Sequence, residues 1–70
     1  MGKRVRLSTF EGPSGSFTAI CSEADGGFRP GFIDNQTGWH TIWSDTLSSE
    51  AAAEVATLRA KSEANKPCKS

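Results

Sequence analysis

Three turn signatures divide residues 5–43 into four short runs, and this division constrains the fold more than any other feature. The signatures are Gly12-Pro13-Ser14-Gly15, Ala24-Asp25-Gly26-Gly27 and Asn35-Gln36-Thr37-Gly38. Proline at the second turn position favours a reverse turn, and Asp-Gly accepts the positive φ angles of a tight hairpin. Short runs between such turns are typical of β-strands. The expected strands are residues 5–11, 16–23, 28–34 and 39–43, and Pro30-Gly31 predicts that the third is an edge, bulged or broken strand.

One helix is expected after these strands. Ser48 is a favoured N-cap residue, and Glu50 falls in the first turn, where the helix dipole stabilises an acid. Good helix formers, alanine above all, continue from Ser49 to about Ala64. Residues 66–70 are expected to form a disordered tail. The helical period predicts that the buried stripe consists of Leu47, Ala51, Val55 and Leu58.

The fold class that follows is α+β: an antiparallel meander of three or four strands, then a C-terminal helix packed on one sheet face. Residues 1–65 are expected to form one small domain. The chain has 70 residues and only 14 large apolar side chains. Each contributes about 2 kcal/mol when buried, against about 1.5 kcal/mol of conformational entropy per ordered residue. We therefore expect that a partner or a second copy adds stability.

The shortest hairpin at each turn sorts the side chains onto two sheet faces, because neighbours along a strand point to opposite sides. The expected cross-strand pairs are Phe10–Phe17, Leu7–Ile20, Ala19–Phe32, Glu23–Phe28, Phe32–Thr41 and Pro30–Trp43. One face then collects all six aromatic side chains, and we expect it to be the core beneath the helix. The other collects Val5, Leu7, Ile20, Ile33 and Ile42, mixed with Thr9, Thr18, Ser22, Arg29 and His40. With the faces reversed, Trp39, Trp43, Phe28 and Arg6 would instead form an exposed platform.

No arrangement of residues indicates catalysis or a cofactor. His40 is the only histidine, and no nucleophile stands at a spacing that would fix it into a catalytic group. Cys21, His40 and Cys68 lack metal-ligand spacing, and the glycines fit turns rather than a phosphate-binding loop. Two cysteines do not make a disulfide framework, so reduced thiols are expected. We expect a non-enzymatic protein with no cofactor, no metal and no small-molecule substrate.

The net charge is zero, but the charge is unevenly spread. Residues 1–10 carry three bases, residues 11–54 seven acids and one base, and residues 55–70 four bases and one acid. Nucleic-acid binders are usually more basic than this. The basic start is not followed by the apolar stretch of a signal peptide, and no run approaches the length of a membrane span. A cytoplasmic location without membrane association is therefore expected.

Two functions are consistent with these patterns. The first is a protein that binds another protein, or a second copy of itself, through the sheet face that the helix leaves uncovered. Its expected contacts are Arg29, Ile33, His40 and Ile42. The alternative is a nucleic-acid-binding module that contacts phosphates. Its expected contacts are Lys3, Arg4, Arg6 and Arg29, joined by Arg59 and Lys61 if the helix C-terminus lies beside the first strand.

The strands followed by Thr46-Leu47-Ser48-Ser49-Glu50-Ala51-Ala52 resemble the arm-type DNA-binding domains of phage and transposon integrases, over roughly residues 16–60. Similar small modules occur in uncharacterised phage and bacterial proteins. The resemblance implies a three-stranded sheet whose face lies against DNA. By size and analogy, the protein-binding module of the first function is expected to be an accessory protein of a phage or other mobile element. This chain departs from the pattern because its second to fourth strands carry only Arg29 as a base. The architecture alone is therefore carried over, and no functional residue.

Overall fold

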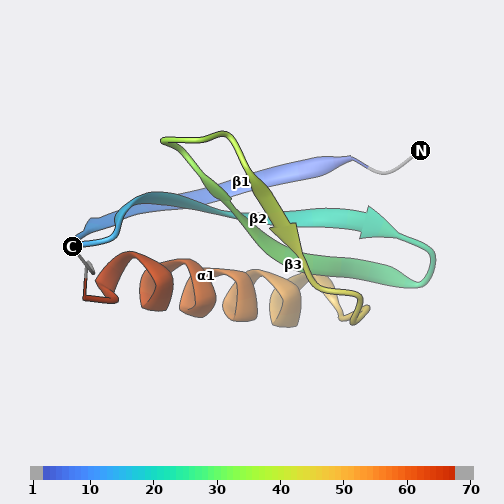
Figure 1. The fold of residues 1–70 in the computed structure, drawn as a ribbon. Coiled ribbons are helices and arrows are strands. Elements are labelled where there is room, and N and C mark those ends of the chain that lie inside the picture. The colour runs from blue at the N-terminus through green and yellow to red at the C-terminus, as the bar shows by residue number, and fades with distance from the viewer. Residues whose placement is uncertain (1–2, 68–70) are drawn as a thin grey trace.

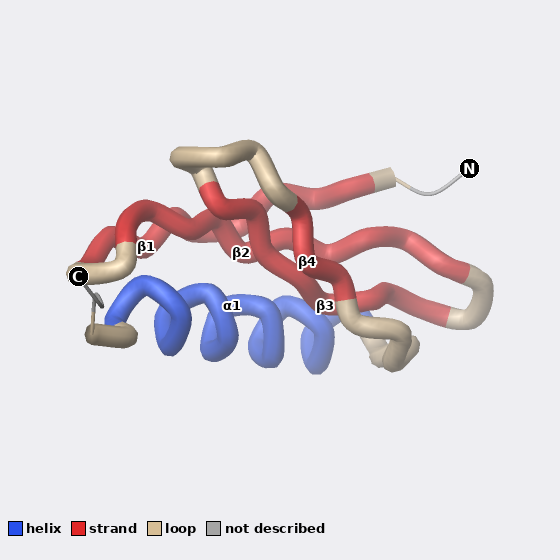
Figure 2. Tube along the Cα trace, in the orientation of Figure 1, coloured by secondary structure: helices blue, strands red, loops and turns tan. Residues whose placement is uncertain are grey.

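The computed structural model describes residues 3–67, which form a four-stranded antiparallel sheet followed by one helix. The strands β1 (Arg4–Gly12), β2 (Gly15–Ala24), β3 (Gly27–Asp34) and β4 (His40–Ile42) are neighbours in chain order. The helix α1 (Ser49–Asn65) lies along one face of the sheet (Figures 1 and 2). The predicted α+β meander with a C-terminal helix is confirmed.

The strand β3 is continuous through Pro30, where an edge, bulged or broken strand was predicted. It lies inside the sheet, between β2 and β4. The carbonyl oxygen of Pro30 accepts a hydrogen bond of 2.9 Å from the backbone N–H of Trp43. Residues in such an antiparallel pair normally exchange two bonds, but proline has no N–H to return. The sheet tolerates Pro30 at this position because β4 ends at Ile42, so the missing N–H of proline falls just beyond the last paired residue of β4.

The predicted register is correct from β2 to β4 and wrong in part of β1. Phe10 lies opposite Phe17, as expected, but Arg6 rather than Leu7 lies opposite Ile20, because a β-bulge falls between Arg6 and Thr9. A bulge adds a residue to one strand and reverses the faces of the side chains beyond it. Leu7 consequently packs against the core beneath α1 instead of lying on the opposite face. Val5 lies opposite Cys21 and so shifts to the α1 side as well.

The helix covers the aromatic face of the sheet, as predicted. The buried cluster beneath it contains Phe17, Phe32, Ala19 and Cys21, and further aromatic side chains pack against its rim. The rings of Phe17 and Phe32 meet edge to face at 84°, with centroids 5.5 Å apart, which is a favourable aromatic geometry. Five of the six aromatic side chains belong to this core, and Trp39, in the β3–β4 loop, does not.

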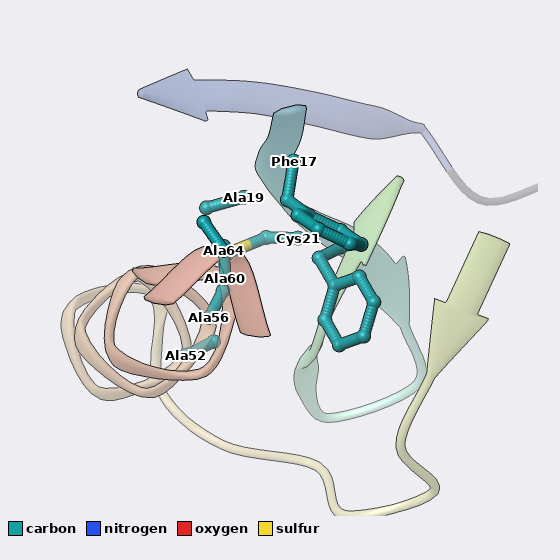
Figure 3. Packing of buried hydrophobic residues seen from close by; sticks show 8 residues of the cluster. Phe17, Ala19, Cys21, Ala52, Ala56, Ala60 and Ala64 are labelled. Atoms are coloured by element: carbon teal, nitrogen blue, oxygen red, sulfur yellow. The ribbon is translucent and has the colours of Figure 1, made fainter. Parts of the chain in front are cut away.

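The buried stripe of α1 is made of alanines, and the predicted stripe is wrong. Leu58 is 60% exposed, whereas every fourth residue on another side of the helix is buried. These residues are Ala52, Ala56, Ala60 and Ala64. They face the sheet side chains directly (Figure 3). Because the phenylalanines already fill the space between the layers, methyl groups let the helix approach the sheet closely.

Both ends of α1 are fixed by hydrogen bonds. The hydroxyl of Ser48 accepts from the backbone N–H of Ala51, which confirms the predicted N-cap. At the other end, the backbone N–H of Ser14 donates to the carbonyl of Ala64, and the Ser14 hydroxyl donates to that of Lys66. Of the predicted tail, Lys66 is thus the C-cap of the helix, and residues 68–70 lie outside the described residues.

Candidate functional site

The sheet face turned away from α1 is the candidate site, and we call it the open face. Cross-strand pairing arranges its side chains in three rows. The rows are Arg4–Ser22–Arg29, Arg6–Ile20–Gly31–Ile42 and Thr9–Thr18–Ile33–His40. The predicted contacts Arg29, Ile33, His40 and Ile42 therefore share one face, together with Arg4 and Arg6. Lys3 precedes β1, and its carbonyl accepts a hydrogen bond of 2.7 Å from the backbone N–H of Glu23.

The centre of the open face is buried although α1 lies on the other side. Ile20 is 0% and Ile33 7% exposed, and neither belongs to the cluster beneath α1. Thr18, which is paired with Ile33 and lies two residues before Ile20 on β2, is buried as well. Its hydroxyl oxygen lies 2.9 Å from both the hydroxyl of Thr9 and the side-chain amide of Asn35. A buried polar group without a hydrogen-bond partner destabilises the folded state, and these two bonds satisfy the Thr18 hydroxyl. The open face is thus a small packed layer.

Because of this burial, only some of the four predicted partner-binding residues are accessible to a partner. Ile33 is largely inaccessible, and Ile42 is half-buried. Arg29 and His40 are exposed. A molecule approaching the open face therefore meets charged and polar groups, with Ile42 as the main apolar contact among the four.

Three arginines, Arg4, Arg6 and Arg29, are exposed on the open face. The only ion pair among residues 3–67 joins Lys66 to Glu63 at 2.9 Å, so these guanidinium groups are not neutralised by a neighbouring carboxylate in the described part of the chain. The acid nearest to them in the open-face register is Glu11, in the row beyond Thr9. Glu23 and Asp34 lie opposite Phe28 and Phe17, on the α1 side. The acidic middle of the sequence is therefore not at the arginine rows.

The alternative function expected Arg59 to join the bases of β1, but Arg59 packs elsewhere. Its guanidinium lies over the ring of Trp43, 4.2 Å from the centroid. It lines a cavity of about 210 Å³ with Phe32, Trp43 and Glu63, among others. A second cavity, of about 390 Å³, shares Phe32 and Glu63 with the first and reaches Trp39.

Trp39 is the surface residue that the sequence reasoning missed, since it was assigned to the core. It is 73% exposed, because the strand β4 begins one residue later, at His40. The sequence signal for this exposure was Gly38. Its φ of 78° is typical of a turn, and the β3–β4 loop continues through Trp39 before β4 begins. The backbone N–H of Trp39 donates to the hydroxyl of Thr37, so the residue belongs to the turn.

The reactive side chains of the described residues show no catalytic arrangement. Cys21 has a free thiol buried beneath α1, and burial raises its pKa. A raised pKa lowers the fraction of the nucleophilic thiolate. His40 is exposed on the open face, away from Cys21 on the α1 side. Within residues 3–67, no group of three or more His, Cys, Asp or Glu side chains is placed to hold a metal ion.

No helix in the described part of the chain has the length and apolar composition to cross a bilayer. A scan of family models, a search of curated proteins and a search of solved structures all found no match for this chain.

Proposed function

We propose that this protein is a small, cytoplasmic, non-catalytic binding module whose open face contacts the phosphate backbone of a nucleic acid. The observation that carries the proposal is the pair of rows bearing Arg4, Arg6 and Arg29, which contain no acidic residue. Exposed arginines of this kind bind phosphates and release the counterions condensed on DNA or RNA. Lys3, next to Arg4 in the chain, adds a fourth positive charge to this edge.

The position of the acids supports the same proposal. Along the sequence, residues 11–54 carry seven acids and one base. In the fold, Glu23 and Asp34 share the side of α1, so they do not face a ligand on the open face. The resemblance to integrase arm-type domains implies the same use of a sheet face, and a role as an accessory protein of a mobile element stays part of the proposal.

The test is the salt dependence of binding. We expect labelled duplex DNA to bind at low salt, with affinity falling as about the third power of salt concentration, since each of the three arginine–phosphate contacts contributes roughly 0.9 to the slope. Arg6→Ala and Arg29→Ala should each reduce the slope by about one. Fluorescence anisotropy titrations across a salt series measure both quantities.

Lys61→Ala is the matched control, because Lys61 is an exposed cation on α1, on the other side of the sheet. It should leave the salt slope unchanged. The proposal is wrong if micromolar protein binds neither DNA nor RNA at low salt, or if Lys61→Ala weakens binding as much as Arg6→Ala does.

A second candidate function is association with another protein or a second copy through the same face. The half-buried Ile42 favours it, because this apolar side chain lies on the edge strand β4, beside the exposed His40. Arg29 and His40 would border such a contact, and the buried Ile33 would support it from beneath. Its test is the molecular mass of the protein in solution, measured at several salt concentrations. Self-association and nucleic-acid binding are expected to depend on salt in different ways.

A further inference from the structure

A cavity of about 390 Å³ opens between the β3–β4 hairpin and the C-terminal half of α1. This is the α1 side of the sheet, away from the arginine rows of the open face. The cavity combines three aromatic rings, two carboxylates and two hydroxyls. Its lining residues are Phe17, Phe32, Trp39, Asp34, Glu63, Thr37 and Thr41.

The aromatic rings give the cavity walls of fixed geometry. Phe17 and Phe32 hold each other edge to face in the core, so they present a rigid floor. Trp39 stands at the mouth, since 73% of its surface is exposed. Aromatic faces carry partial negative charge and attract cations, and they favour cations that are weakly hydrated.

The two carboxylates come from different elements. Asp34 is the last residue of β3, and Glu63 lies in the last turns of α1. Both side chains are half-buried, and no lysine or arginine is among the residues that line this cavity. Asp34 accepts a hydrogen bond from the backbone N–H of Gln36 through one oxygen, and Glu63 pairs with Lys66 at 2.9 Å outside the lining. Lys66 therefore neutralises Glu63, and Asp34 is the carboxylate of this aromatic cavity that has no ion-pair partner among residues 3–67.

The neighbouring cavity already contains the interaction that this one is suited to make. There, the Arg59 guanidinium lies 4.2 Å from the centre of the Trp43 ring, and the Lys66 ammonium meets Glu63. In the smaller cavity, the chain thus supplies its own cations. In the larger cavity, Trp39 and Asp34 have no such cationic partner among the lining residues.

We propose that the larger cavity binds an organic ammonium ion, supplied by a methylated lysine side chain of a partner protein. Charge complementarity to Asp34, which has no ion-pair partner among residues 3–67, selects a cation, and the three aromatic rings select one whose methyl groups replace its hydration shell. A methylated ammonium also fits a cavity of this volume better than a small metal ion, which would require converging oxygen ligands. This site is separate from the open face and does not depend on the proposed nucleic-acid binding.

The experiment compares three short peptides of one sequence that carry trimethyllysine, lysine or the neutral carbon isostere of trimethyllysine. Binding is followed by the chemical shift of the Trp39 indole N–H during titration of ¹⁵N-labelled full chain. We expect trimethyllysine to bind best and the neutral isostere at least about tenfold more weakly, because only the cation gains from the rings and carboxylates. Equal binding of the cation and its isostere, or no shift with any peptide at millimolar concentration, would overturn the proposal.

Two variants locate the interaction. Asp34→Asn keeps the carbonyl oxygen that accepts from Gln36 but removes the charge, and it should weaken trimethyllysine binding at least about threefold. Trp39→Ala, followed by backbone amide shifts, should weaken it at least about fivefold. Leu58→Ala, another exposed apolar side chain on α1, is the control and should have no effect. Unchanged affinity in both test variants refutes the site, whereas Arg6→Ala should impair nucleic-acid binding alone.

Discussion

The burial of a single side chain, Cys21, is expected to make the stability of this protein depend on pH. Cys21 lies beneath α1, and burial raises the pKa of its thiol above the ordinary value of 9.0. The folded chain therefore holds the proton more tightly than the unfolded chain does. This contribution to stability is complete below the unfolded pKa and is lost as the pH rises through the folded pKa.

We predict that the free energy of unfolding falls above pH 9.0, by at most about 1.4 kcal/mol per pH unit for this one group. Urea unfolding of a Cys68→Ser variant, in which Cys21 is the only thiol, measures the slope. The double variant Cys21→Ala, Cys68→Ser is the control, because it retains every other titrating group. Identical slopes in the two proteins would show that the thiol does not contribute.

Among the elements, α1 shows most clearly what limits inference from the sequence. The predicted stripe followed the large side chains Val55 and Leu58, on the usual assumption that bulk marks the buried face. That assumption fails because Phe17 and Phe32 supply the bulk from the sheet, and the helix then buries its smallest side chains. The helix limits, set by the Ser48 cap and the helix formers after it, were predictable from local chemistry alone.

This packing predicts opposite results for two substitutions on α1. Ala56→Leu should lower the free energy of unfolding by about 1–3 kcal/mol, because Ala56 is fully buried against the sheet and a larger side chain must push the helix away. Leu58→Ala should change it by less than about 0.5 kcal/mol, because that leucine is mostly exposed. Denaturant unfolding followed by circular dichroism measures both, and a larger loss for Leu58→Ala would contradict the observed phase of the helix.

The sheet was predictable to the extent that its turns were. Asp25-Gly26 fixed the pairing of β2 with β3, and the turn before β4 fixed the placement of Phe32 opposite Thr41. The bulge in β1 had a signal in the sequence that a regular register ignores. Val5 and Leu7 are two residues apart, but the next apolar residue, Phe10, follows three residues later, and the bulge falls in that interval. For the candidate site, the shared face of Arg29, Ile33, His40 and Ile42 follows from the turns. The burial of Ile33 depends on packing across the whole sheet, which no local pattern encodes.

At the scale of the whole molecule, the fold places the arginines of the sheet and two of its acids on opposite faces. The arginines of β1 and β3 lie on the open face, whereas Glu23 and Asp34 lie on the side of α1. The two candidate functions respond to this separation in opposite ways. A nucleic acid neutralises Arg4, Arg6 and Arg29, so salt weakens its binding. Two copies that meet through their open faces would bring like charges together, so salt should favour their association.

Salt concentration distinguishes self-association through the open face from nucleic-acid binding at the same face. If the chain pairs through the open face, sedimentation equilibrium should give a dimer whose dissociation constant falls as salt is raised from low to moderate concentration. Ile42→Asp should yield a monomer with an unchanged circular dichroism spectrum, because Ile42 is half-buried at the edge strand β4. Val5→Asp is the control: Val5 is 46% exposed, on the opposite edge strand and in register with Cys21 on the α1 side. A wild-type chain that is monomeric at every salt concentration would exclude self-association and leave the arginine rows free for a nucleic acid.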